Sequence, residues 1–386
     1  MTLLKNYAKK PRRSGKQENK MDRKGDKRYM DMALKLALKA ADRTYPNPMV
    51  GAVIVKNGRV IGKGYHRRAG APHAEINAIR GARESCGGST MYVTLEPCDH
   101  YGKTPPCTEA IIKSGIKKVN IAMKDPNPAN NGRGIKKLKK AGIKVNSGIC
   151  AEDAELLNKK YIKFIKQGLP YVTVKLAQSL DGKIAAGDGS SKWISSGSSR
   201  KRARKMRAGF DAVVVGANTV LADDPYLLDA QRHPCDVARV VVDTRLRTPE
   251  ASNLVKTAGK APLIIGTTEL APENKIAALR EKGVKVLVTK SRKGKVPLKI
   301  FFRALAGEGL VNILVEGGGE LVGGLMDEKL IDEVMFFIAP KILGGPYSSI
   351  KGRGAGNIAA ALDVEGAEVS MSGGDIFVRG NICSRV

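Results

Sequence analysis

Apolar residues in the first 150 positions follow helical and strand spacings in turn. Residues 29–42 repeat apolar side chains at helical spacing and predict a helix. Residues 49–56 and 59–65 are rich in β-formers, and the Asn57-Gly58 pair between them is a hairpin signal. The same reasoning predicts strands at 90–95, 117–123 and 143–148, and helices at 73–83, 105–114 and 133–141. Strands that alternate with crossover helices are typical of an α/β layer sandwich.

A second alternating series begins after residue 170. An amphipathic helix over 151–169 should end at Gly168, and Pro170 follows it, so we place the domain boundary there. Polar or Gly/Pro-rich loops are expected at 187–199 and 222–236, with a basic connection at 289–297. Strands are predicted at about 171–177, 211–215, 238–242, 262–266, 284–288, 311–315 and 333–338. The second half is therefore also expected to be α/β.

These patterns predict four segments along the 386 residues. Residues 1–28 form a basic, disordered tail, 29–150 a first domain, 151–170 a linker helix and 171–386 a second domain. The tail has no apolar stretch of the length that a secretory signal needs. The tail could be an arm that binds nucleic acid, but a solvated extension without a role is the favoured interpretation. Met21 and Met30 stay open as alternative start positions.

Composition and charge narrow the functional classes only in part. Hydrophobic residues make up 42% and charged residues 27%, as in globular proteins, and no apolar run is long enough for a membrane span. The six cysteines do not form a secreted disulfide pattern, so a cytoplasmic location is expected. The net charge of +30 favours anionic partners, either nucleic acid or phosphorylated small molecules.

One constellation in the first domain predicts a catalytic zinc site. His73, Cys98 and Cys107 offer one imidazole and two thiolates, and we expect each of these motifs at a helix start. Three protein ligands leave the fourth position to water, whose pKa the metal lowers. Glu75 lies two residues after His73 and can carry a proton from that water to a departing amine. This is the chemistry of a base deaminase.

The spacing of the two cysteines distinguishes classes of deaminase. Nucleic-acid and nucleoside deaminases usually carry Pro-Cys-x-x-Cys, whereas eight residues separate Cys98 from Cys107 and place His100, Tyr101 and Lys103 at the mouth of the site. The alternative of a structural zinc site is disfavoured because such sites usually have four protein ligands. An RNA-base deaminase with a non-reductase second domain remains the alternative function, although the chain has no known RNA-binding motif.

Several long segments resemble one family. They are PNPMVGAVIV (46–55), HAEINAI (73–79), VTLEPCDHYGKTPPC (93–107), DPNPANNGRGIKKLKKAGIKV (125–145), VKLAQSLDGKIA (174–185), ADDP (222–225), VEGGGELVGGL (315–325) and IDEVMFFIAPKILGG (331–345). On these segments the chain resembles the bifunctional riboflavin-biosynthesis deaminase/reductase family. The resemblance implies a cytidine-deaminase-like domain followed by a dihydrofolate-reductase-like domain, and a homodimer or homotetramer with no specific nucleic-acid partner.

The resemblance also implies the reactions and the cofactors. Zinc-dependent deamination of 2,5-diamino-6-(5-phosphoribosylamino)pyrimidin-4-one would be followed by NADPH-dependent reduction of the ribosyl group to ribityl. The implied substrate contacts of the deaminase are Asn47, His66, Lys103, Asp125 and Asn127. For Asn47 and Asn127 the residues alone favour turn chemistry instead.

In the second domain, a glycine run after Glu316 follows a predicted strand and opens a helix. Such a turn can bring backbone N–H groups to a phosphate, although it is not a GxGxxG fingerprint. The family pattern implies NADPH contacts at Ala177, Trp193, Thr219, Asp223, Thr244, Gly318, Gly319, Glu320, Leu321, Val322, Gly323 and Gly324. It implies substrate contacts at Lys175, Ser191, Arg207, Leu227 and Glu316, with Arg207 suited to clamp a phosphate.

Two positions depart from the family pattern. The family commonly has an Arg where this chain has Ala230, and Arg232 is the candidate to replace it in binding the substrate. Asp99 follows Cys98 where Ser is more usual, and its charge lies next to a predicted zinc ligand.

Overall fold

The computed structural model describes residues 20–41, 44–101, 105–228 and 237–383, with side chains from residue 25 onward. They divide into two compact units. The first contains helix α1 (Lys20–Ala37) and Met49–Leu157, and the second begins at Asn158 and also takes in the segment before Met49. No helix among the described residues has the length and apolar character that crossing a bilayer requires.

The first unit is built on a five-stranded sheet of order β2-β1-β3-β4-β5. β1 pairs antiparallel with β2 and β3, and the β3-β4-β5 pairs are parallel. The inner strands read as nearly continuous apolar runs because helices cover both of their faces. The strands are β1 (Gly51–Lys56), β2 (Arg59–Tyr65), β3 (Thr90–Leu95), β4 (Lys118–Met123) and β5 (Lys144–Ser147).

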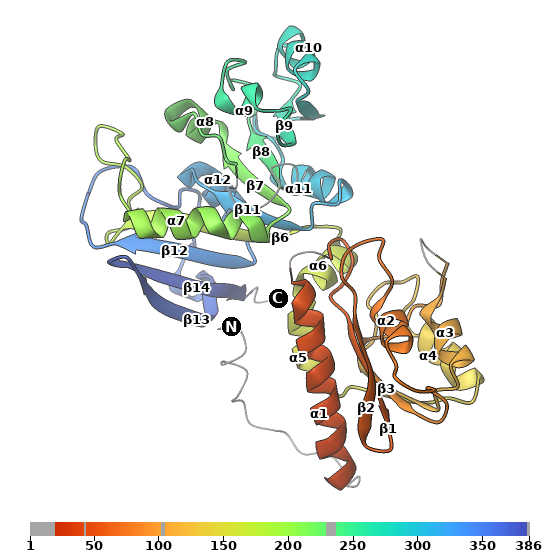
Figure 1. The fold of residues 1–386 in the computed structure, drawn as a ribbon. Helices are drawn as coiled ribbons and strands as arrows, with labels where there is room; N and C mark the ends of the chain where they lie inside the picture. Colours follow the sequence, from red (N-terminus) through yellow and green to blue (C-terminus); the bar gives the residue numbers. More distant parts are fainter. Residues whose placement is uncertain (1–19, 42–43, 102–104, 229–236, 384–386) are drawn as a thin grey trace. The chain divides into compact units, whose positions relative to one another are not determined.

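Helices cover both faces of this sheet, as Figure 1 shows. On one face lie α1 and α5 (Ala151–Leu157), and on the other α2 (Ala74–Arg80), α3 (Cys107–Lys113) and α4 (Arg133–Lys140). Glycine permits the close approach of α2 to β2: a Cβ on Gly64 would lie 2.2 Å from the carbonyl oxygen of Ala74. The predicted α/β sandwich is confirmed.

The first helix begins at Lys20, so residues 20–28 are helical where the sequence predicted a disordered tail. Asp26 explains the difference, because its carboxylate accepts hydrogen bonds from the hydroxyl of Tyr92 and from Nδ2 of Asn120 (3.2 Å). Nζ of Lys118 also lies 3.5 Å from Asp26. These partners are distant in sequence and leave no periodic apolar signal.

The predicted linker helix 151–169 is two helices. α5 ends at Leu157, α6 (Lys159–Gln167) follows, and the buried Asn158 separates them. The two compact units meet in the chain at this same break. Gly168 ends α6 in a left-handed conformation at φ 63°, as predicted.

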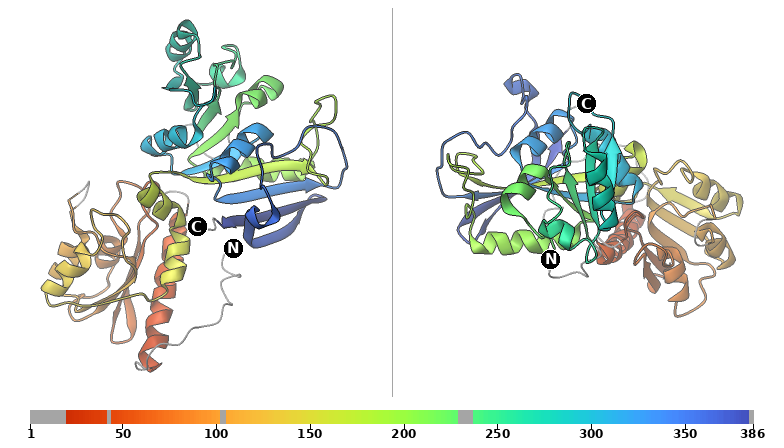
Figure 2. Two further views of the ribbon diagram at one scale, coloured as in Figure 1. Left: turned by 180° about the vertical axis from the view of Figure 1, so that it is seen from behind. Right: turned by 90° about the horizontal axis from the view of Figure 1, so that it is seen from above.

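The second unit is built on a nine-stranded sheet of order β10-β9-β8-β7-β11-β6-β12-β14-β13, seen from two further sides in Figure 2. Its pairs from β10 to β12 are parallel, and β14 and β13 are antiparallel. The strands are β6 (Tyr171–Ser179), β7 (Ala212–Gly216), β8 (Ala238–Val242), β9 (Leu263–Thr268), β10 (Lys285–Thr289), β11 (Asn312–Glu316), β12 (Glu333–Ala339), β13 (Asp363–Ser372) and β14 (Asp375–Cys383).

Two apolar cores form, one on each face of this sheet. α11 and α12 contribute Phe302 and Leu325 to one core, whereas α7 to α10 contribute residues such as Val220 and Leu279 to the other. The helices of this unit are α6, α7 (Gly197–Met206), α8 (Ala217–Asp223), α9 (Asn253–Lys256), α10 (Glu273–Glu281), α11 (Leu298–Gly307) and α12 (Gly319–Asp327), with 3-10 turns at Arg207–Gly209 and Ile358–Ala360.

The sequence did not predict the last two strands. β13 is exposed along all but its final residue, so its side chains carry no consistent inward and outward alternation. Gly373 and Gly374, with φ values of 59° and 92°, form the turn that returns the chain into β14.

Candidate active sites

The structure brings the three predicted metal ligands of the first unit together. His73 precedes α2, Cys98 lies in the loop after β3, and Cys107 is the first residue of α3. Nδ1 of His73 lies 3.2 Å from Sγ of Cys107 and 3.5 Å from Sγ of Cys98. The three donor atoms all lie within 4.8 Å of one another. The expectation that each motif stands at a helix start is wrong for Cys98.

The three side chains of this cluster shift one another's pKa. A hydrogen bond from Cys107 holds the pKa of Cys98 well below its usual range, and Cys107 itself is raised in pKa by the same contact. The interaction with Cys98 raises the pKa of His73. One nitrogen and two sulfur donors, with room in a tetrahedral set for a fourth ligand, fit zinc.

Glu75 is the carboxyl group beside this cluster. It lies in the first turn of α2 and is 3% exposed. Burial raises its pKa to about 7, helped by the charge of Cys98 and opposed by His73. A carboxyl group that titrates near neutrality can both accept and release a proton, as the predicted role of Glu75 demands.

His66 lies against the cluster, as expected for a substrate contact. Its ring meets that of His73 edge-on, with the ring centroids 5.3 Å apart. Nδ1 of His66 lies 3.3 Å from the carbonyl oxygen of Pro72, and burial lowers the pKa of the imidazole. A neutral imidazole beside a metal ligand adds no charge that would compete with the metal.

The other predicted substrate contacts of the deaminase are in turns or outside the described residues. Asp125 accepts a hydrogen bond from the backbone of Asn127 (2.9 Å), and Asn127 accepts one from that of Ala129 (3.0 Å), so both side chains form local turns. Asn47 groups with the second unit, and its N–H bonds the carbonyl of Thr44 at 2.8 Å. Lys103 lies outside the described residues.

Sequence reasoning missed Glu96, although it stands inside the quoted LEPC segment. Its buried carboxylate accepts three backbone hydrogen bonds, from Asp125 (3.2 Å), Gly132 (2.9 Å) and Ile135 (3.2 Å). It therefore caps the N-terminus of α4 from a distant segment. The signal was a carboxylate directly after a buried strand, two residues before a metal ligand.

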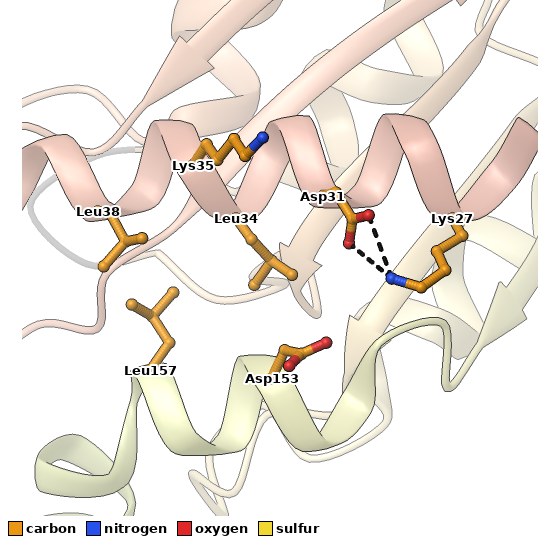
Figure 3. A pocket seen from close by; sticks show the side chains of 7 residues that line it. All are labelled: Lys27, Asp31, Leu34, Lys35, Leu38, Asp153 and Leu157. Carbon is orange, nitrogen blue, oxygen red and sulfur yellow. Dashed lines mark hydrogen bonds and ion pairs between the residues drawn. The ribbon is translucent and has the colours of Figure 1, made fainter. Parts of the chain in front are cut away.

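A second group of metal-binding residue types occurs in the first unit. Asp31, Cys150 and Asp153 place their donor atoms within 4.8 Å of one another. Asp31 and Asp153 line the pocket between α1 and α5 in Figure 3. Nζ of Lys27 already lies 3.1 Å from the carboxylate of Asp31. Burial raises the pKa of Cys150 to about 11. This group offers two carboxylates, one of them already paired with Lys27, and a single sulfur, so its donor set differs from the one nitrogen and two sulfurs of the first group.

In the second unit, three predicted substrate residues form one ion-pair cluster. Arg207 donates two hydrogen bonds to Glu316, at 2.7 and 3.0 Å, and Nζ of Lys175 lies 3.3 Å from the same carboxylate. Burial alone would raise the pKa of Glu316, but Lys175 and Arg207 lower it to about 2. The carboxylate is thus fixed in its charged form, at the end of β11.

The glycine run after Glu316 makes a tight turn into α12. Gly317 and Gly318 have φ values of 113° and 63°, which favour glycine. A Cβ on Gly317 would lie 3.1 Å from Oγ1 of Thr219, and one on Gly323 would lie 1.1 Å from the carbonyl oxygen of Lys351. Glycine therefore allows the chain to approach its neighbours closely along this turn, and the turn opens α12, whose N-terminus can attract a phosphate of a dinucleotide.

Trp193, another predicted cofactor contact, presents an exposed aromatic ring. It is 62% exposed, and the guanidinium of Arg200 lies 4.3 Å from its ring centroid. Nζ of Lys341 bonds its carbonyl at 2.8 Å. The neighbouring Lys192 pairs with Asp223, another predicted cofactor contact, at 3.2 Å. Packing in a core is therefore excluded for Trp193, and a ligand can reach its ring.

The sequence profile of the cytidine and deoxycytidylate deaminase zinc-binding region matches residues 23–123, and that of the RibD C-terminal domain matches residues 170–378. The riboflavin biosynthesis protein RibD of Aquifex aeolicus is 44% identical over 362 residues, which cover 93% of this chain and 99% of the relative. This chain belongs to the RibD family.

Other RibD proteins agree over both units. Escherichia coli RibD is 40% identical over 332 residues, covering 83% of this chain and 89% of the relative. Acinetobacter baumannii RibD superposes with a TM-score of 0.81 at 36% identity, covering 94% of this chain and 100% of the other. The deaminase/reductase of Thermotoga maritima superposes with a TM-score of 0.78 at 34% identity, with the same two coverages.

Membership in the RibD family confirms the predicted fold class and the predicted pairing of a zinc deaminase with an NADPH-dependent reductase of riboflavin biosynthesis. The alternative of an RNA-base deaminase with a non-reductase second domain finds no support in these matches. The matched residues cover the predicted deaminase domain and the predicted reductase domain of one chain.

The remaining predicted contacts of the reductase are spread over several strand ends. Thr244 follows β8, and its Oγ1 accepts a hydrogen bond from the backbone of Val296 at 3.4 Å. Leu227 is buried with a φ of 53°, Ala177 lies on β6, and Ser191 is half-buried in the loop before α7. Arg232 and the Ala230 that departs from the family both lie outside the described residues.

Proposed function

We propose that the first unit catalyses the hydrolytic deamination and the second the reduction, each with the residues described above. One observation carries the deaminase assignment. His73, Cys98 and Cys107 converge within 4.8 Å beside the buried carboxyl of Glu75. Three nitrogen or sulfur ligands with a nearby proton carrier are the parts of a catalytic zinc site.

In the deaminase, bound zinc supplies Lewis acidity and lowers the pKa of a water molecule. Glu75 accepts a proton from the attacking water and delivers it to the amine that leaves the pyrimidine ring. Its pKa of about 7 lets the same carboxyl group perform both transfers. His66 borders the base, and Asn47, Lys103, Asp125 and Asn127 complete the proposed substrate contacts.

In the reductase, bound NADPH supplies the hydride that converts the ribosyl group to ribityl. The turn at Gly318 and Gly319 would hold a phosphate of the cofactor at the start of α12. The ring of Trp193 offers a face for stacking. The other proposed cofactor contacts are Ala177, Thr219, Asp223, Thr244, Glu320, Leu321, Val322, Gly323 and Gly324.

The ion-pair cluster would orient the reductase substrate. Glu316 stays anionic and fixes the positions of Lys175 and Arg207, which can donate hydrogen bonds to hydroxyl or phosphate oxygens. Because both donors of the Arg207 fork already bond Glu316, a phosphate would have to share or replace that contact. Ser191, Leu227 and Arg232 are the remaining proposed contacts.

The proposal includes the identity of the substrate and the state of the enzyme. The diamino phosphoribosylamino-pyrimidine carries a phosphate, in agreement with the strongly basic chain. A homodimer or homotetramer follows the family pattern. A cytoplasmic location agrees with the free thiols of the cysteines among the described residues.

A coupled assay tests both activities at once. The diamino substrate is supplied with and without NADPH, and ammonia release and NADPH oxidation are followed together. We expect ammonia in both cases, and NADPH oxidation only after deamination. If the zinc-loaded protein released no ammonia, the deaminase assignment would fail. If it released ammonia but did not oxidise NADPH with the deaminated product, the reductase assignment would fail.

A further inference from the structure

Residues 99–106 form the connection between the two cysteine ligands, and hydrogen bonds join the two ends of this connection. The backbone N–H of Thr108 donates to the carbonyl oxygen of Cys98 at 3.2 Å. The hydroxyl of Thr108 donates to the carboxylate of Asp99 at 2.9 Å. Each partner in these contacts is either a cysteine ligand or the residue directly after one. The bonds therefore set the separation between Cys98 and Cys107.

Asp99 also joins these two ends to the loop before α4. Its backbone N–H donates to Oδ1 of Asn130 at 3.0 Å, and Nδ2 of Asn130 donates to Asp125 at 3.2 Å. The side chain of Asp99 is 19% exposed and Thr108 is fully buried, so water competes weakly for their contact.

Lys137 of α4 joins the two sides of the connection. Its Nζ lies 2.7 Å from Asp99, at the start of the connection, and 3.2 Å from Glu109, just after its end. The hydroxyl of Tyr101 donates to Glu109 at 3.1 Å, which binds the connection itself to the same network. Because Glu96 caps the N-terminus of α4, the position of Lys137 within this helix is set independently of the connection.

We propose that Asp99 and Lys137 are positioning residues for the zinc site: together with Thr108 they hold the two thiolates at metal-binding separation before the metal arrives. This inference rests on the proposed zinc-dependent deaminase. Residues outside the ligand set that orient the ligands commonly change metal affinity by tenfold or more when they are removed. Lys137 also offsets the charge of Asp99, which would otherwise stand uncompensated near two sulfur ligands.

Zinc affinity tests the proposal directly. The dissociation constant for zinc is measured by competition with a chromophoric chelator for the whole chain and for D99A, K137A and the double variant. We expect the constant to rise about tenfold in D99A and about threefold in K137A, where the contacts are more exposed. If Asp99 and Lys137 position the thiolates as one network, the dissociation constant of the double variant should resemble that of D99A, because the effects of contacting residues are not additive.

A cobalt-substituted enzyme gives a second readout. The thiolate-to-cobalt absorption bands report the geometry of the ligands, and we expect them to shift in D99A and K137A but to recover in K137R. D99N keeps an oxygen that can accept the Thr108 hydroxyl and should lie between D99A and the natural protein. K139A is the matched control, because Lys139 is exposed on the same helix and should leave zinc affinity unchanged.

The outcomes separate this inference from the proposed function. If the natural protein bound no zinc, the proposed deaminase function would fail, and the positioning role of Asp99 and Lys137 would fail with it. If the natural protein bound zinc while D99A and K137A kept its zinc affinity and its cobalt spectrum, only the positioning role of Asp99 and Lys137 would be overturned. Should D99A not fold, K137A decides alone, since a change at a half-exposed lysine leaves the core intact.

Discussion

The two candidate sites differ in how their charged and polar groups are satisfied. In the first unit, His73, Cys98 and Cys107 face one another with donor atoms that suit a cation. In the second unit, Glu316 already has its cations, Lys175 and Arg207, within the protein. The donor set of the first arrangement suits a metal, whereas the charges of the second already balance one another within the protein.

This difference predicts different responses to the same kind of change. Removing one member of the zinc site should abolish chemistry and leave the fold largely unchanged, because the remaining groups can pair with one another or with water. Removing Glu316 should destabilise the fold as well, because two buried cations would lose their counter-charge. Stability and activity should therefore separate in the first unit and change together in the second.

The largest expected effect is on deamination. Glu75→Gln keeps the shape of the side chain but removes the proton carrier, so ammonia release should fall by roughly a hundred- to ten-thousand-fold. Zinc content, measured by metal analysis, should stay unchanged, and NADPH oxidation with the deaminated product should continue as in the natural protein. Full ammonia release by this variant would remove the basis of the deaminase assignment.

The next effect is on the stability of the second unit. Glu316→Gln leaves Lys175 and Arg207 without a carboxylate and should lower the free energy of unfolding by about 3–5 kcal/mol. Urea unfolding can be followed through Trp193, the single tryptophan of the chain, which reports on this unit alone. Glu281→Gln, an exposed acid on α10, is the control and should have almost no effect. Equal stability of the two variants would contradict the prediction.

A smaller effect should appear on acidification. The pKa of Glu316 is held at about 2 against an ordinary value of 4.5, so its contribution to stability is complete above pH 4.5. As the pH falls from there towards 2, the unfolded chain takes up the proton first, and up to about 3 kcal/mol is lost. The stability gap between the natural protein and the Gln variant should narrow over this range. A gap that stayed constant would show that Glu316 is not the group concerned.

The smallest effect separates the two groups of metal-binding residue types in the first unit. Cys150→Ser should leave the zinc content unchanged, because Lys27 already pairs with Asp31 and the group offers only one sulfur donor. Cys98→Ser should lose zinc. Metal analysis after dialysis measures the zinc content of both variants. Loss of zinc in the Cys150 variant would show that zinc has been assigned to the wrong group of residues.

Much of the zinc site could be predicted from the sequence because its parts stand in short, contiguous motifs. Glu75 lies two residues after His73, and Cys98 lies three residues after the end of a buried strand. The contacts that hold the site could not be predicted in this way. Glu96 bonds backbone groups up to 39 residues away, and Asp26 bonds Asn120 across 94 residues. Such pairs leave no local pattern.

The same limit applies to the fold. The buried strands β3 and β8 match their predicted bounds because their apolar runs are continuous, and β2 matches because the Asn57-Gly58 hairpin signal precedes it. The hairpin of β13 and β14 was missed because most of β13 faces solvent. The reductase contacts came only from the family pattern, since Lys175, Arg207 and Glu316 approach one another from three separate segments.

The segment just before Met49 has a consequence for dividing the chain. It groups with the second unit, although the residues on either side of it belong to the first. Within the second unit, Nζ of Lys160 lies 5.5 Å from the centroid of the Tyr45 ring. A gene cut once, after Leu157, would therefore deprive the reductase fragment of a piece of its own surface. Two separately expressed halves would each need redesign before either could serve as a stand-alone catalyst.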